Sequence, residues 1–146
     1  MMSLCLRYSK NEEDALDVLN TGFLKVFKNI YRYDAAKASL YTWMRTIIIN
    51  TCLDFVRVWQ KEPITGELDH AENIQVAPEV ISRMGSDELL QMVRQLPPAT
   101  QAVFNLYIIE GFSHKEIGTL LGISDGTCKW HLSEARKKLK VLFNAQ

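Results

Sequence analysis

The chain has 146 residues, 47% of them hydrophobic, and its 17 Lys and Arg are balanced by 17 Asp and Glu. This length suits one domain or two small ones. No apolar run is long enough to span a membrane, and there is no signal-peptide pattern, glycine-rich phosphate loop or nucleophile elbow. These features predict a cytoplasmic protein without membrane insertion and argue against an enzyme.

Charge is segregated along the chain although its sum is zero. Residues 1–60 carry 8 basic and 6 acidic side chains, residues 61–86 carry 2 and 5, and residues 87–146 carry 7 and 6. A neutral total therefore does not exclude a nucleic-acid binder, because the acidic excess lies in the middle.

Cysteines and histidines give no metal-site pattern. The cysteines are odd in number, widely separated and set in apolar helical contexts, which predicts buried free thiols in a reducing cytoplasm: Cys5, Cys52 and Cys128. The histidines form no close pair with one another or with a cysteine: His70, His114 and His131. We expect no metal and no cofactor.

The first predicted long helix is capped by Asn11. Apolar residues recur at spacings of three and four and predict a core face: Ala15, Val18, Leu19, Phe23, Val26, Phe27 and Ile30. The other side carries polar residues: Asp14, Asp17, Asn20, Lys25 and Lys28. Periodicity does not distinguish a solvated surface from a partner-docking surface there.

A second long helix is predicted from Ser39. Its inward residues are Leu40, Trp43, Met44, Ile47 and Ile48. Another face carries one polar ridge along which a nucleic-acid strand could lie: Thr46, Asn50, Asp54 and Arg57. Aromatic side chains around the ridge can stack on exposed bases, although a core or rim position is the commoner role of each alone: Tyr31, Tyr33, Tyr41, Trp43 and Trp59.

A linker is predicted over residues 61–85, because this segment loses apolar periodicity and contains Pro63, Gly66, Pro78 and Gly85. Strand-like alternation does not persist anywhere, and no internal repeat is visible. The expected fold is therefore all-α, with two small helical domains over residues 1–60 and 86–146.

Residues 113–140 predict a helix-turn-helix. Ser113 and Glu116 have the spacing of a capping box, Gly118 leaves room for a crossing helix, Gly122 suits the turn, and Ser124 caps the second helix. Cys128 and Leu132 are spaced to pack against the first helix, which leaves Lys129, Trp130 and Ser133 facing outwards. In such motifs the start of the second helix enters the major groove.

The second helix of this motif ends in a basic segment. The last eighteen residues carry five Lys or Arg against one Glu, which suits phosphate contacts. A basic, solvated helix end is the simpler explanation of these charges alone. The capping and turn pattern before them favours DNA binding.

The order DALDVLNTGFLKVFKNI, SLYTWMRTIIINTCLDFVR, linker and LPPATQAVFNLYIIEGFSHKEIGTLLGISDGTCKWHLSEARKKL resembles the extracytoplasmic-function (ECF) sigma factors of the sigma-70 family. The resemblance covers nearly the whole chain. It implies a bacterial transcription initiation subunit with sigma region 2 over residues 1–60 and region 4 over residues 86–146. The acidic linker would run through the polymerase towards the RNA exit path.

The resemblance also implies binding residues. Docking on the clamp helices of the largest subunit of core RNA polymerase would involve Asp14, Asp17, Asn20 and Lys25. Recognition and melting of the minus-10 element of promoter DNA would involve Trp43, Arg45, Asn50, Asp54 and Arg57. Contacts to the minus-35 element would come from Thr127, Lys129, Trp130, Ser133, Arg136 and Lys137. An anti-sigma factor is a further partner that members of the family often have.

The chain departs from the family pattern in three places. Met1 and Met2 fall inside the family's first helix, so we expect about one helix to be missing, Phe23 and Phe27 to lose a packing partner and the region 2 core to be less stable. Asn20 stands where the family usually has Gln. Trp130 and Glu134 replace residues that are often small and basic respectively, and Glu134 would repel phosphate unless it accepts a hydrogen bond from cytosine.

Two other classes of protein remain as alternatives. A LuxR-like helix-turn-helix regulator would usually carry a mixed α/β sensing domain in place of the first block, and no strand-helix alternation is visible there. A helical protein-interaction module would use the apolar stripes without DNA, which leaves the basic second helix unexplained.

Overall fold

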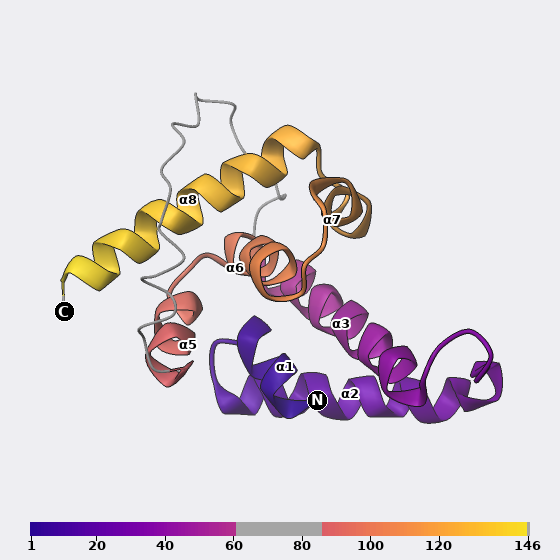
Figure 1. The fold of residues 1–146 in the computed structure, drawn as a ribbon. Helices are drawn as coiled ribbons and strands as arrows, with labels where there is room; N and C mark the ends of the chain where they lie inside the picture. The colour runs from indigo at the N-terminus through magenta and orange to yellow at the C-terminus, as the bar shows by residue number, and fades with distance from the viewer. Residues whose placement is uncertain (61–85, 146) are drawn as a thin grey trace. The chain divides into compact units, whose positions relative to one another are not determined.

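The computed structural model describes residues 1–60 and 86–145, so the predicted linker lies outside the described residues. Within this part of the chain the regular structure is helical and contains no strand (Figure 1). The expected all-α class is confirmed. The chain forms two compact units, Met1–Trp59 and Gln60–Gln146.

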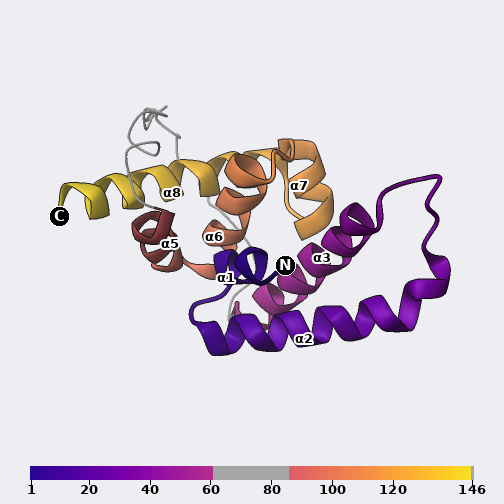
Figure 2. The ribbon, with the colours of Figure 1, turned by 60° about the horizontal axis from the view of Figure 1, so that its bottom comes forward.

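The first unit consists of α1 (Met2–Tyr8), α2 (Glu12–Asn29), the short 3-10 turn η1 (Ile30–Arg32) and α3 (Leu40–Trp59). The side chain of Asn11 accepts a hydrogen bond from the Asp14 amide at 2.8 Å, which confirms the predicted cap of α2. Helix α1 packs against both α2 and α3, which also pack against each other (Figure 2). Leu4, Cys5 and Tyr8 of α1 are buried.

The buried stripe of α2 is made of small residues: Ala15, Val18, Gly22 and Val26. A Cβ atom on Gly22 would overlap the side chain of Ile48, so α2 and α3 approach closely at this point. Because this narrow stripe occupies the contact between α2 and α3, the larger side chains beside it on α2 remain outside the contact. Phe27 is 72% exposed and Ile30 is 48% exposed, so their predicted place in the core is wrong.

Burial along α3 is concentrated in its second half. It begins at Ile48, the residue that meets Gly22, and continues to Val56. The first turns of α3 lie beyond this contact, so Leu40 is 43% exposed and its predicted inward position is wrong. Trp43, Met44 and Ile47 are half-buried.

The second unit contains α5 (Ser86–Arg94), α6 (Pro98–Phe104), the π-helical segment η2 (Asn105–Ile109), α7 (His114–Leu121) and α8 (Asp125–Asn144). Apolar residues of α5, α6 and α8, together with Leu96 of the connection between α5 and α6, form one core cluster: Met92, Val93, Leu96, Phe104, Ala135 and Leu139. Helix α8 packs against α5, α6 and α7 and is therefore the element that organises this unit (Figure 1).

Candidate nucleic-acid interface

The start of α7 has the predicted capping box. Ser113 Oγ accepts a hydrogen bond from the Glu116 amide at 3.2 Å, and Glu116 Oε2 accepts one from the Ser113 amide at 2.8 Å. These bonds favour the ionised carboxylate and hold the pKa of Glu116 below its usual range. The capping box therefore fixes where the helix-turn-helix begins.

The turn between α7 and α8 confirms the roles predicted for its glycines. Gly122 has a φ of 69°, and both its amide and that of Ile123 donate to the carbonyl of Gly118. A Cβ atom on Gly118 would lie 2.7 Å from the Ile123 carbonyl oxygen, so the chain crosses α7 too closely for a side chain. Ser124 then caps α8 by accepting a hydrogen bond from the Thr127 amide at 3.1 Å.

The inner face of α8 is wider than the sequence predicted. Cys128 and Leu132 are buried as expected. Ser133 is only 7% exposed, so its predicted outward position is wrong. The difference arises because α8 packs against α5 and α6 as well as α7, which a two-helix motif does not require. Lys129 is exposed and Trp130 is half-exposed, as a groove-reading surface needs.

Two histidines join the motif to the rest of the unit, and sequence reasoning gave neither a role. His114 Nδ1 lies 3.3 Å from Cys128 Sγ, while the Tyr107 ring stacks on His114 with centroids 4.6 Å apart. His131 is buried, its Nδ1 lies 3.0 Å from Thr100 Oγ1, and burial lowers its pKa to about 4. A sequence signal was absent because the partners are distant along the chain.

The basic end of α8 contains one internal ion pair. Lys137 Nζ lies 3.2 Å from Glu134 Oε1, while Lys138 and Lys140 are exposed and Arg136 is half-buried. The neighbouring Lys137 reduces the repulsion that Glu134 was expected to exert on phosphate. Trp130 meets His131 edge-to-face with centroids 4.9 Å apart. Thr127 Oγ1 lies 3.0 Å from Ser124 Oγ, so that hydroxyl takes part in the cap.

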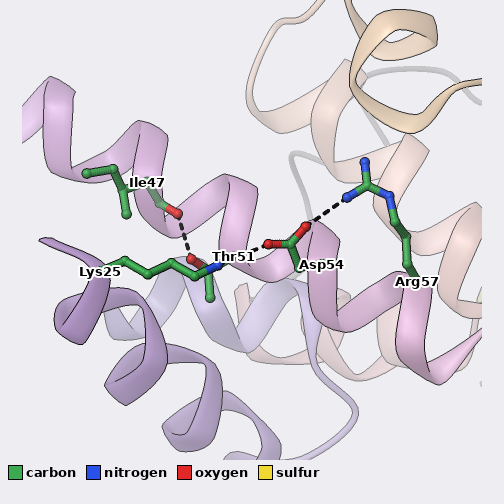
Figure 3. Close-up of polar contacts among 5 residues, drawn as sticks. All are labelled: Lys25, Ile47, Thr51, Asp54 and Arg57. Atoms are coloured by element: carbon green, nitrogen blue, oxygen red, sulfur yellow. Dashed lines mark hydrogen bonds and ion pairs between the residues drawn. The ribbon is translucent and has the colours of Figure 1, made fainter. Parts of the chain in front are cut away.

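The polar ridge predicted on α3 is present and exposed, because Thr46, Asn50, Asp54 and Arg57 are all exposed. At the end of this ridge Asp54 binds two cations: Oδ2 lies 3.0 Å from Lys25 Nζ, and Oδ1 lies 2.8 Å from Arg57 Nη1 (Figure 3). Lys25 belongs to α2, so the ridge includes a residue that was predicted to serve polymerase docking.

The aromatic residues around the ridge differ in exposure: some are half-buried and others are exposed. Trp43 is half-buried and packs against Tyr33 with ring centroids 5.6 Å apart. Tyr31 and Tyr41 are 73% and 61% exposed, and the Arg32 guanidinium lies over the Tyr31 ring, 5.5 Å from its centroid. The rings of Trp59 and Phe55 meet edge-to-face, with centroids 5.5 Å apart. Arg45, predicted to contact DNA, is half-buried.

The four residues predicted for polymerase docking do not share one face. Asp17 and Asn20 are exposed, whereas Asp14 is half-buried and accepts from Asn11 Nδ2 at 3.0 Å. Lys25 follows Asn20 by five residues, which turns it about 140° away around the helix. The residues beside Asn20 are instead apolar: Leu16, Leu24 and Phe27 are 50%, 54% and 72% exposed.

The part of the chain that the structure describes has no group of three or more His, Cys, Asp or Glu that could hold a metal ion. No described helix combines the length and apolarity that crossing a membrane requires. All three cysteines are free and buried, as predicted.

A capped helix-turn-helix in one unit and an exposed polar ridge in the other define a two-unit helix-turn-helix protein. The pattern of sigma-70 region 2 matches residues 1–61, and that of sigma-70 region 4 matches residues 86–139. The chain belongs to the sigma-70 family, and its relatives place it in the ECF group.

Similar proteins include the ECF RNA polymerase sigma factor SigE of Mycolicibacterium smegmatis, 32% identical over 94% of this chain and 54% of the relative. The ECF RNA polymerase sigma factor SigM of Mycobacterium tuberculosis is 29% identical over 92% of this chain and 66% of its own length. The chain thus spans less than two thirds of these relatives. The fold resembles that of the sigma factor RpoE in its complex with the anti-sigma factor NepR from Bartonella quintana, with a TM-score of 0.62, 19% identity and coverage of 99% and 90%.

Proposed function

We propose that this chain is an ECF sigma factor, which binds core RNA polymerase and directs it to promoter DNA in the bacterial cytoplasm. One observation carries the proposal: an exposed polar ridge in a region 2 unit and a capped helix-turn-helix in a region 4 unit occur in the same chain. The curated relatives carry names of RNA polymerase sigma factors. The chain itself supplies binding surfaces and no covalent chemistry.

The minus-35 element would be read by the first half of α8. Lys129 and Trp130 are available at the surface, while Arg136, Lys137 and Thr127 are partly exposed for phosphate or base-edge contacts. Ser133 is buried and does not belong to this surface. Lys138 and Lys140 extend the positive charge beyond the predicted set.

The minus-10 element would be opened against α3. Asn50 is exposed in the middle of the ridge and offers both a donor and an acceptor to an extruded base. The half-buried Trp43, with Arg45 on the same helix, would support the neighbouring strand. Stacking on aromatic rings contributes about 1–3 kcal/mol per base, which makes Trp43 and the exposed Tyr41 the natural platforms.

Core polymerase would dock on the exposed face of α2, which we call the docking patch: Leu16, Asp17, Asn20, Leu24 and Phe27. An apolar centre rimmed by polar residues is the usual anatomy of such an interface. Phe27, at 72% exposure, is the expected anchor. The clamp helices of the largest subunit are the proposed partner.

An anti-sigma factor is the second proposed partner. The structural neighbour was crystallised with one, and the docking patch is an apolar surface that an inhibitor could cover in competition with polymerase. A LuxR-like regulator would not account for a first unit that matches sigma region 2.

Run-off transcription with purified core polymerase, this chain and promoters from its own genome tests the proposal. We expect a transcript that core polymerase alone does not make. Changing Lys129, Arg136 and Lys137 together to Ala should abolish promoter selection at moderate salt while leaving polymerase binding intact. Absence of any transcript from this chain and from a version extended upstream would refute the sigma assignment, and unchanged promoter binding by the triple variant would refute the role of α8.

A further inference from the structure

Asp54 is the meeting point of two cations from different helices. Its carboxylate contacts Lys25 Nζ of α2 at 3.0 Å and Arg57 Nη1 of α3 at 2.8 Å, one cation on each oxygen (Figure 3). The side chains of Lys25, Asp54 and Arg57 are 41%, 53% and 46% exposed. The three side chains therefore form an open surface cluster in which one carboxylate contacts two cations.

The ion pairs of this cluster are weak enough for another anion to replace the Asp54 carboxylate. Exposed ion pairs contribute about 0.2–1 kcal/mol each, because water and salt screen them. Thr51 and Leu53, on the same stretch of α3, are buried, and the Thr51 hydroxyl donates to the Ile47 carbonyl at 2.8 Å (Figure 3). A competing anion can therefore displace the Asp54 carboxylate without disturbing the helix packing.

A nucleic-acid phosphate has the chemistry of that competing anion. Like a carboxylate, it presents negatively charged oxygens that accept from an ammonium and a guanidinium together. Asp54 lies four residues after Asn50 on the exposed ridge of α3, one helical turn along. A strand that follows this ridge would bring a backbone phosphate to the position that the carboxylate now fills.

We propose that Lys25 and Arg57 form a backbone-phosphate site that spans α2 and α3, and that Asp54 is its intramolecular competitor. Asp54 occupies both cations in the free chain and weakens binding to nucleic acid of any sequence. Lys25 thereby acts in strand binding and not in polymerase docking. The proposal rests on the proposed function only in taking the ridge of α3 as the strand path.

The test measures how the affinity of the full chain for a single-stranded DNA oligonucleotide of mixed sequence depends on salt. The slope of log K against log salt is about −0.7 for each neutralised phosphate on a single strand. Asp54→Asn keeps the shape of the side chain and removes the carboxylate that Lys25 and Arg57 share, so one added phosphate contact should steepen the slope by about 0.7. Each added contact means a further loss of affinity of about 2.6-fold between 50 and 200 mM salt.

Two further variants make the result specific. Lys25→Met in the Asp54→Asn background should remove about 0.7 of the gained slope, because one cation is lost while the length of the side chain is kept. Glu13→Gln removes one exposed carboxylate from α2 outside the cluster and serves as the matched control for net charge. Circular dichroism melts of all variants should agree with the wild type to within a few degrees, since only exposed pairs change.

An unchanged slope for Asp54→Asn would overturn the proposal, and so would an equal steepening for Glu13→Gln, which would mean that net charge alone is responsible. Transcription assays separate this result from the function. If the wild type starts transcription and the slopes do not differ, the phosphate site is wrong and the sigma assignment stands. If the slopes differ as expected and no transcript forms, the sigma assignment fails and the phosphate site stands.

Discussion

Replacing Gly118 with Ala tests the close crossing inside the helix-turn-helix. The added Cβ would lie 2.7 Å from the Ile123 carbonyl oxygen, which is closer than such atoms normally approach. Ile123 has little room to retreat, because its amide donates to the Gly118 carbonyl at 3.1 Å. Overpacking of this kind costs about 1–3 kcal/mol, and a clash with fixed backbone belongs in the upper half of that range. Alanine favours the helix over glycine by about 1 kcal/mol, so we expect the free energy of unfolding to fall by about 1–2 kcal/mol in total.

Urea denaturation of the full chain measures this loss, with Trp43 and Trp59 changed to Phe so that Trp130 of α8 reports on the second unit. The control is Gly122→Ala, where no atom lies within 4 Å of the added Cβ and the cost comes only from its φ of 69°. We expect about 1–2 kcal/mol there too, but Gly122→Asn should recover part of it, because Asn tolerates this conformation. If Gly118→Ala instead raises stability by the helix-propensity gain, the close-crossing argument is wrong.

Three further outcomes follow from the burial and capping of the second unit and of the cysteines. Burial lowers the pKa of His131 from 6.5 to about 4, so as the pH falls the unfolded chain takes up a proton before the folded chain does. The free energy of unfolding should therefore drop by about 3 kcal/mol between pH 6.5 and 4, as measured by urea denaturation at each pH. A His131→Gln variant with the same loss of stability over this pH range would show that His131 is not its cause. Ser113→Ala should cost about 1 kcal/mol in thermal melts, and no change would mean that the cap does not hold α7. Cys5, Cys52 and Cys128 should react with an aromatic disulfide reagent only as fast as the chain unfolds, whereas prompt reaction of any thiol in buffer would show that it is accessible.

The helix-turn-helix could be predicted from the sequence almost residue by residue, because its determinants are local. The capping box of Ser113, the left-handed Gly122 and the cap at Ser124 each act within a few residues of themselves. The wrong predictions all concern burial that depends on tertiary packing. Ser133 became buried because α8 has more neighbours than the motif requires.

In the first unit, too, local features could be predicted from the sequence and tertiary packing could not. Periodicity marked Phe27 as apolar at helical spacing, but it did not reveal that a stripe of small residues through Gly22 would be the buried one. The polar ridge of α3 was predicted correctly, since four residues on one helix face need no partner to define them. The contact between Lys25 and Asp54 joins residues that are 29 positions apart, and no spacing rule reaches that far.

The small-residue stripe of α2 has a consequence for the free chain. By giving the contact with α3 to Ala15, Val18 and Gly22, the fold leaves Leu24 and Phe27 in water. Apolar surface of this kind favours self-association, which grows with concentration, so dilute chain should stay monomeric while concentrated chain forms aggregates that a bound partner prevents. The abundance of the chain in a cell would then be limited by the supply of the partner that covers this surface.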